Sequence, residues 1–398
     1  MSLTFHWFLP TAGDGRGIVG RGHSIPLAGA TARPGELASG ARAAARAPDI
    51  DYLGQVARSA EQLGFTGVLT PTGTWCEDAW LTTAALISQT RRLKFLVAFR
   101  PGFIAPTLAA QMAATYQRIS RGRLLLNVVT GGEDSEQRRF GDYLSHDERY
   151  ARTGEFLDIV RAAWRGTPYD FEGAHYKVEG ATVMARPDPV PAVYFGGSSP
   201  AAGPVAARYV DVYLTWGEPP QAIASKIAWM RELAEQAGRT LRFGIRLHTI
   251  SRDTPKDAWA EADRMLAELS PEEIARSQQA LAKSASVGQA TMRGLHQAFR
   301  DGGRAADLEI YPNLWAGVGL VRGGAGTALV GSHAEVADRI EEFASLGISE
   351  FILSGYPHLE EAYWFGEGVL PELRRRGAVG APDDLSSLLT PAGAAAGG

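Results

Sequence analysis

The sequence predicts an α/β fold in which eight parallel strands and their helices close into a (β/α)8 barrel of the TIM type. Short β-rich apolar runs alternate with stretches whose apolar residues recur every three or four positions, a pattern typical of repeated βα units. The apolar runs are eight in number, at residues 4–9, 67–70, 94–99, 124–129, 192–195, 212–215, 242–250 and 350–353. Eight strands favour a closed barrel over an open sheet, and 398 residues suit one such domain.

The segments between these strands predict helices and three insertions. Helices are expected at residues 51–63, 106–119, 149–164, 220–236 and 334–346. The insertions lie near residues 20–48, 169–183 and 256–308; the second reads as a hairpin, and the third as helices at 256–268 and 271–282 followed by a polar, glycine-punctuated stretch. Such long loops are commonly lids. We expect a single domain over residues 1–376 and a disordered, low-complexity tail over 377–398.

Composition narrows the classes of function. The chain has 44 acidic and 40 basic residues without a lysine-rich block, which argues against nucleic acid or an anionic membrane and favours a small-molecule partner. The one cysteine, Cys76, excludes an intramolecular disulfide, and no CxxC or HExxH pattern suggests a metal site. The N-terminal apolar run has no basic leader and is too short to span a bilayer, so we expect a cytoplasmic protein.

Two glycine motifs raise the question of a bound phosphate. GxGxxG at residues 15–20 follows a strand, but no helix and no acidic strand end follow it, so we reject a dinucleotide fingerprint. In FGGSSP at 195–200 a strand leads into glycines and serines, which places Ser199 as a helix N-cap and Pro200 as the first helical residue. The local sequence fits a phosphate site and an ordinary capped helix equally well.

Charged and aromatic residues gather at the predicted strand ends. The two-residue period puts Arg246 and His248 on one face of their strand, and in a barrel one face points inward. Such groups need water, an anion or a partner, so either an ion pair or a ligand site is possible. Tyr356 and His358 repeat this spacing just past the last strand, at the catalytic end of such folds.

Two further residues carry open alternatives. A lone cysteine such as Cys76 is more often a small buried apolar residue than a nucleophile. Arg322 lies in a glycine-rich, mobile run that could bring its guanidinium onto an anion, and the alternative is a solvated loop arginine.

These motifs together resemble the alkanesulfonate monooxygenases of the bacterial luciferase-like superfamily. The resemblance runs from about Leu3 to Leu373, and its motifs keep the family's order. It is carried by WFLPT, GVLTPTG with CEDAW, LKFLVAFRP, NVVTGG, SHDERY, YFGGSS, YLTWGEPP, RFGIRLH, NLWAGVGLVRGGAGTALVG and LSGYPHLEEAY.

The resemblance implies a luciferase-like barrel that binds reduced FMN (FMNH2) loosely, activates O2 and cleaves the C–S bond of alkanesulfonates to aldehyde and sulfite. A separate NAD(P)H-dependent FMN reductase would supply the flavin, and the family implies a homotetramer. By position, the active site would be lined by Cys76, Trp216, Arg246, His248, Arg322, Tyr356 and His358. The FMN phosphate would contact Tyr150, Ser198 and Ser199, while Asn127 and the Val97–Ala98 peptide, often cis in this superfamily, would lie near the flavin ring. Arg246 and Arg322 suit a sulfonate because guanidinium stays charged and binds oxygens in pairs.

The chain departs from the family pattern near its start. Relatives often carry a histidine where this chain has Ala12, and a glutamate that the insertion at 20–48 makes impossible to place. Both concern a loop over the pocket, so they bear on the substrate range. The competing interpretations are a relative that uses deazaflavin F420 or oxidises a sulfone, and a non-catalytic flavin-binding protein on the same fold.

Overall fold

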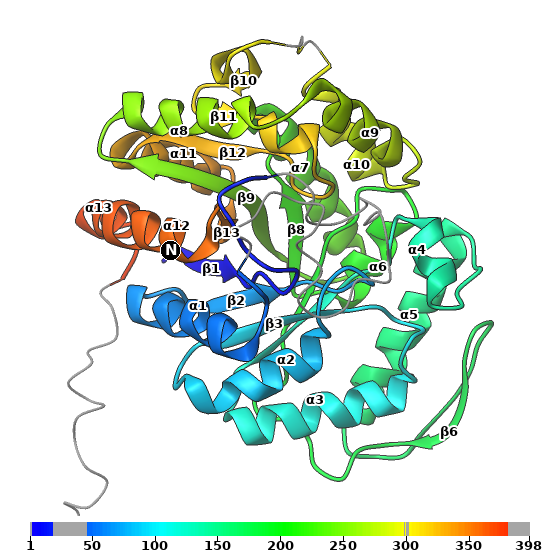
Figure 1. Ribbon diagram of the computed structural model, residues 1–398. Helices are drawn as coiled ribbons and strands as arrows, with labels where there is room; N and C mark the ends of the chain where they lie inside the picture. The colour runs from blue at the N-terminus through cyan, green and yellow to red at the C-terminus, as the bar shows by residue number, and fades with distance from the viewer. Residues whose placement is uncertain (1, 19–45, 298, 300–301, 381–398) are drawn as a thin grey trace, which may run out of the picture.

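Eight parallel strands form a closed barrel, as the sequence predicts (Figure 1). The computed structural model describes residues 2–18, 46–297, 299 and 302–380. Neighbouring strands pair in chain order, and β13 returns to β1 while β9 pairs with β8, which completes the ring. The barrel strands are β1 (Thr4–Phe8), β2 (Gly67–Thr70), β3 (Lys94–Phe99), β4 (Leu124–Val128), β7 (Val193–Phe195), β8 (Val212–Trp216), β9 (Arg242–Arg252) and β13 (Ile348–Ser354).

The alternation of side chains along these strands creates two apolar layers. Leu69, Leu96, Leu125 and Ile352 meet inside the barrel and fill its lumen. The residues between them face outward and form the larger core with the surrounding helices. The polar side chains near the carboxyl ends of the strands therefore lie directly above a lumen that is filled with apolar side chains.

A ring of helices covers the strands (Figure 1). Its members are α1 (Ile50–Leu63), α2 (Ala79–Leu86), α3 (Pro106–Ser120), α4 (Asp134–Arg139), α5 (His146–Ala163), α6 (Ala202–Tyr209), α7 (Pro220–Gln236), α11 (His333–Ser345), α12 (His358–Trp364) and α13 (Leu370–Arg375). A 3-10 turn (Ile87–Gln89) follows α2, and a π-helical turn (Phe365–Val369) joins α12 to α13. Local signals begin several helices: the Asp49 carboxylate accepts from Tyr52 N, and Ser145 and Ser332 form capping boxes.

Two of the predicted insertions are seen. The hairpin consists of β5 (Tyr169–Glu172) and β6 (Lys177–Ala181), as expected. Between β9 and β13 lie α8 (Pro255–Ala267), α9 (Pro271–Leu281), α10 (Val287–Gly294), a 3-10 turn (Ala305–Leu308), β10 (Glu309–Tyr311), β11 (Leu314–Trp315), another 3-10 turn (Gly317–Leu320) and β12 (Ala328–Ser332). Most of the first predicted insertion, at residues 20–48, lies outside the described residues.

The segment between β9 and β13 corrects the sequence interpretation in two places. Residues 284–308 are not all loop, because α10 forms there with Ser286 as its N-cap. The glycine-rich run around Arg322 is not a solvated loop, because Val318, Leu320 and Val321 are at most 2% exposed. They pack with α8, Ile250 and Tyr356 into a second apolar core. β12 then pairs in parallel with the carboxyl half of β9.

A buried polar cluster closes the amino-terminal end of the barrel. The Glu350 carboxylate, 1% exposed, accepts a hydrogen bond from the Tyr194 hydroxyl at 2.6 Å. It also contacts His6 Nε2 at 3.3 Å and forms an ion pair with Arg242. Although burial raises the pKa of Glu350, these partners outweigh that effect and lower it. The cluster satisfies charges at the end opposite the predicted active site.

The two ends of the described chain lie together. Leu3 N donates to Ala378 O at 3.1 Å, so the first residues of the expected tail are attached to the residue before β1. Residues 381–398 lie outside the described part. No helix among the described residues is both long and apolar enough to cross a bilayer.

Candidate active site

Arg246 and His248 of β9 point into the carboxyl end of the barrel. Arg246 lies opposite Ile352, a lumen residue of β13, and His248 lies opposite Ser354 two positions on. The Arg246 guanidinium lies over the Phe8 ring at 4.9 Å. The face that these residues share is therefore the inner one.

The Ser354 hydroxyl connects the two β9 side chains. Arg246 Nη2 donates to Ser354 Oγ at 2.8 Å, and Ser354 Oγ lies 2.7 Å from His248 Nδ1. On the other side of the ring, His248 Nε2 lies 3.0 Å from Ala325 O. Because a carbonyl only accepts, Nε2 carries the hydrogen and Nδ1 accepts from the serine hydroxyl. Both nitrogens of His248 are thus occupied by protein groups.

Tyr356 stands at the centre of the remaining predicted residues. Its ring stacks on His248 with centroids 5.3 Å apart and meets His358 edge-on at 5.0 Å. The Arg322 guanidinium lies over the same ring at 4.9 Å. We call Arg246, His248, Arg322, Tyr356 and His358 the arginine–histidine cluster. The structure brings these five predicted residues together from β9, the glycine-rich run and the segment after β13.

The cluster is positively charged at neutral pH. Burial lowers the pKa of Arg246 to about 10, which still leaves it protonated. Burial lowers the pKa of His248 well below its ordinary value and also lowers that of His358, so both rings are neutral. Burial raises the pKa of Tyr356, whose hydroxyl keeps its proton and remains a donor. Within the described part of the chain, neither guanidinium forms an ion pair with a carboxylate. The cluster therefore fits an anionic ligand.

A cavity that is partly open to solvent brings together four predicted residues at the carboxyl ends of β7 and β8. Tyr150 comes from α5, Ser198 and Ser199 follow β7, and Trp216 ends β8. The first turn after β7 is tight, because Ser199 O accepts from both Ala202 N and Gly203 N. α6 consequently begins at Ala202, two residues later than predicted, although the Ser199 hydroxyl still accepts from Ala202 N at 3.3 Å.

The cavity wall fits a phosphate group. It offers the hydroxyls of Tyr150, Ser198 and Ser199. Gln289 Nε2 is buried there without a hydrogen-bond partner in the described residues, so one donor is available for an acceptor oxygen. Gly197 leaves room at the wall, since a Cβ at that position would come within 3.0 Å of the Tyr150 hydroxyl oxygen.

A family model described as luciferase-like monooxygenase matches residues 5–350. The chain belongs to this family. Solved structures with the same fold include a riboflavin lyase determined with modified FMN and riboflavin (20% identity, TM-score 0.74, 96% of this chain and 94% of that one). A long-chain alkane monooxygenase is 18% identical with a TM-score of 0.73, over 96% of this chain and 94% of the other. EDTA monooxygenase from Chelativorans sp. BNC1 is 18% identical with a TM-score of 0.69, over 96% of each chain.

In this member of the luciferase-like monooxygenase family, Ala98 and Asn127 lie side by side in the barrel wall. They pair across β3 and β4 and follow the lumen residues Leu96 and Leu125 by two positions. Val97 faces the other way, into the core between strands and helices. The Val97–Ala98 peptide is trans, because the cis bonds among the described residues are Asp188–Pro189 and Tyr356–Pro357. The regular β3–β4 ladder runs unbroken through it, which corrects the expectation of a cis bond.

Cys76 lies in the loop after β2 and takes no part in the hydrogen bonds of the arginine–histidine cluster described above. Its Sγ donates to Gly73 O at 3.6 Å. Burial raises the pKa of the thiol to about 12, so no thiolate exists at neutral pH. Cys76 is therefore a partly buried small residue, and a protonated thiol does not suit the role of nucleophile.

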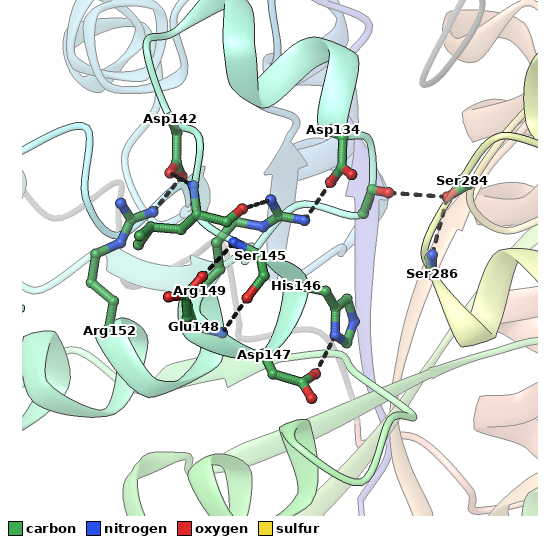
Figure 2. Close-up of polar contacts among 12 residues, drawn as sticks. Asp134, Asp142, Ser145, His146, Asp147, Glu148, Arg149, Arg152, Ser284 and Ser286 are labelled. Carbon is green, nitrogen blue, oxygen red and sulfur yellow. Dashed lines mark hydrogen bonds and ion pairs between the residues drawn. The ribbon is translucent and has the colours of Figure 1, made fainter.

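The loop between α9 and α10 crosses from the insertion to the β4 side of the barrel (Figure 2). Ala285 N donates to Gly132 O at 2.9 Å, and the Ser284 hydroxyl donates to the same carbonyl at 3.4 Å. Trp216 packs so closely on α10 that a Cβ at Gly288 would lie 2.9 Å from its ring. α10 therefore covers one side of this cavity.

Figure 2 also shows how the start of α5 is held. Ser145 and Glu148 form its capping box, and Arg149 Nη2 donates to Asp134 at 2.8 Å. Arg152 Nη2 donates to Asp142 at 2.5 Å. These bonds fix the first turns of the helix that carries Tyr150 into the cavity.

Three site residues were missed by sequence reasoning. Ser354 continues the two-residue period of Tyr356 and His358 backward by one step, so the spacing could have found it. Asp14, which binds His358, is separated from it by 344 residues, and no local pattern reveals such a contact. Gln289 lies in a stretch that reads as loop, and nothing in that composition singles it out.

Proposed function

We propose that this chain is a two-component monooxygenase that uses FMNH2 and O2 to cleave the C–S bond of alkanesulfonates, with aldehyde and sulfite as products. The observation that carries the proposal is the pair of guanidiniums, Arg246 and Arg322, without a carboxylate partner in the described residues. A sulfonate is a permanent anion with three acceptor oxygens. Guanidinium groups bind such oxygens in pairs and stay charged when desolvated, so this class of substrate satisfies the cluster.

The cavity beside the cluster supports FMN as the cofactor. Ser198, Ser199, Tyr150 and Gln289 would hold the phosphate, and Ala98 and Asn127 would lie beside the ring. Bound reduced FMN would supply the electrons that activate O2. The chain's own task is then to bind the sulfonate on its two arginines, to donate a hydrogen bond from Tyr356, and to exclude water beneath α10.

The proposal extends to the partners of the enzyme. The GxGxxG run at residues 15–20 lacks the helix and the acidic strand end of a dinucleotide-binding sequence. A separate NAD(P)H-dependent FMN reductase would therefore deliver the reduced flavin. A cytoplasmic homotetramer is part of the same proposal.

Sulfite release measures this function directly. Chemically reduced FMN, air-saturated buffer and a chain-length series of linear alkanesulfonates should give sulfite and aldehyde in equal amounts. Dimethyl sulfone, which is neutral, should give neither, and NADPH with oxidised FMN should give none until a reductase is added. Turnover of the sulfone in preference to every sulfonate, or turnover only with reduced F420, would contradict the proposal.

A further inference from the structure

Asp14 is a buried carboxylate beside the arginine–histidine cluster, and the proposed function has so far given it no role. It lies in the loop after β1 and is 1% exposed. Its oxygens accept from His358 Nδ1 at 2.8 Å, from His358 N at 2.8 Å, from Gly15 N at 2.8 Å and from the Tyr52 hydroxyl. So many donors indicate a carboxylate that stays ionised.

The charge of Asp14 agrees with this geometry. Burial by itself raises its pKa, but the interactions with His358 and Tyr52 outweigh burial and lower it to about 2. Tyr52 is held in turn by Arg46, whose Nη1 donates to the tyrosine oxygen at 3.2 Å. Arg46 also forms an ion pair with Glu360 at the surface. The negative charge of Asp14 is thus fixed against one side of the His358 ring.

This contact determines which nitrogen of His358 carries the proton. Because the carboxylate only accepts, Nδ1 is protonated, and in the neutral ring the lone pair is on Nε2. Nε2 points away from Asp14, and no described residue hydrogen-bonds it. The groups that face the ring besides Asp14 all lie in or beside the cluster: Tyr356, Phe8, Arg246, Arg322 and His248. His248 differs, since both of its nitrogens are occupied.

We propose that Asp14 and His358 split 1-hydroxyalkanesulfonates, the bisulfite adducts of aldehydes, in a step that needs neither flavin nor oxygen. The proposal rests on the proposed function, because a monooxygenase that places one oxygen atom on C1 of an alkanesulfonate would form such an adduct. The O–H bond then breaks and its proton moves to His358 Nε2. The O–H electron pair forms the carbonyl bond, the C–S bond breaks, and its electron pair leaves with sulfur as sulfite. Neither carbon nor sulfur exchanges electrons with an outside oxidant in this step.

The surrounding groups suit this substrate. Arg246 and Arg322 would hold the sulfonate, whose negative charge grows as sulfite forms. His358 is then the catalytic base, and Asp14 is a positioning residue that fixes its tautomer and stabilises the imidazolium after proton transfer.

The test uses the full-length protein with no flavin added and the bisulfite adducts of formaldehyde and butanal as probes. Sulfite release is followed with a thiol reagent and compared with spontaneous decomposition at the same pH. We expect the wild type to accelerate release at least about 100-fold, the lower range for a positioned general base. His358→Asn should abolish the acceleration, while thermal unfolding reports whether each variant is folded.

The pH profile separates positioning from a merely structural role. The enzymatic rate should rise with pH as His358 loses its proton and then reach a plateau. Asp14 raises the pKa of His358, so Asp14→Asn should move the rising limb to lower pH and lower the plateau at least about tenfold. Asp211→Asn is the matched control: this carboxylate also accepts from Val193 N and two arginines, but at the amino-terminal end of the barrel. Its profile should match the wild type.

Three results would overturn the inference. The first is that wild-type protein desulfonates alkanesulfonates with FMNH2 but does not accelerate adduct cleavage. The second is full acceleration by His358→Asn, and the third is an Asp14→Asn variant whose plateau rate falls while the rising part of its pH profile does not move. The opposite pattern, adduct cleavage without any flavin-dependent desulfonation, supports the Asp14–His358 assignment and refutes the proposed function instead.

Discussion

Replacing Ser354 by Ala tests how the cluster is organised. Ser354 is fully buried, and its hydroxyl accepts from the Arg246 guanidinium and donates to His248 Nδ1. The substitution removes one hydrogen bond to a charged group, which contributes about 1.5 to 3 kcal/mol, and leaves the imidazole acceptor unpaired. Arg246 keeps its contacts with Leu247 O and Ile352 O, so it stays in place but loses its orientation. If this free energy is lost from the binding of the transition state, kcat/KM falls about 10- to 100-fold.

The assay is sulfite release at subsaturating sulfonate, together with urea unfolding. Ser349→Ala is the matched control, because Ser349 is also buried on β13 and donates to Phe243 O at 3.4 Å, but at the other end of the strand. We expect both variants to lose about 1 kcal/mol or more of unfolding free energy and only Ser354→Ala to lose kcat/KM. Equal kcat/KM in the two variants would show that the serine does not position Arg246.

The other predictions concern the anion sites and acid stability. Arg322→Ala should lower kcat/KM about 10- to 100-fold and Arg322→Lys should recover little, whereas Arg276→Ala, an exposed arginine of α9, should act like the wild type. Ser199→Ala should weaken FMN binding, measured by fluorescence quenching, but not riboflavin binding; equal losses refute its phosphate role. The pKa of Asp14 is about 2, so its stabilisation is complete above the ordinary value near 4 and disappears as pH falls towards 2. Urea unfolding of Asp14→Asn should therefore depend less on pH than wild type between pH 5 and 2.

The barrel could be predicted because its signals are local. β2, β3 and α7 have the predicted bounds, and the other barrel strands differ from prediction by a few residues at their ends. Each is an apolar run or an amphipathic period that stands out within a short window. β12 was missed because glycines precede it, because Gly331 lies within it, and because its strand character comes from pairing with β9, far away in sequence.

The site divides in the same way. Arg246 and His248 share a face because strand period alone requires it, and Tyr356 and His358 follow from their position after the last strand. The pairing of Asp14 with His358 depends on how the loop after β1 meets α12 across the barrel rim, which no window of sequence contains. Which tautomer each histidine adopts is likewise determined by acceptors, Ala325 O and Asp14, that only the folded chain supplies.

The long strand β9 pairs with two different strands along one of its edges. Its amino half pairs with β8 up to the Trp216–Arg246 pair, and on the same edge its carboxyl half pairs with β12 from the His248–Ala328 pair onward. β8 and β12 therefore lie end to end along the same edge of β9. A hydrogen bond connects the segments at this joint, because Thr327 Oγ1 donates to Gly217 O at 2.8 Å. The β8–β9 and β12–β9 ladders share no residue pair, so separate sets of backbone hydrogen bonds hold the barrel wall and the segment that ends in β12. Arg246 belongs to the first ladder and His248 to the second, so the two β9 side chains of the cluster lie on either side of the joint.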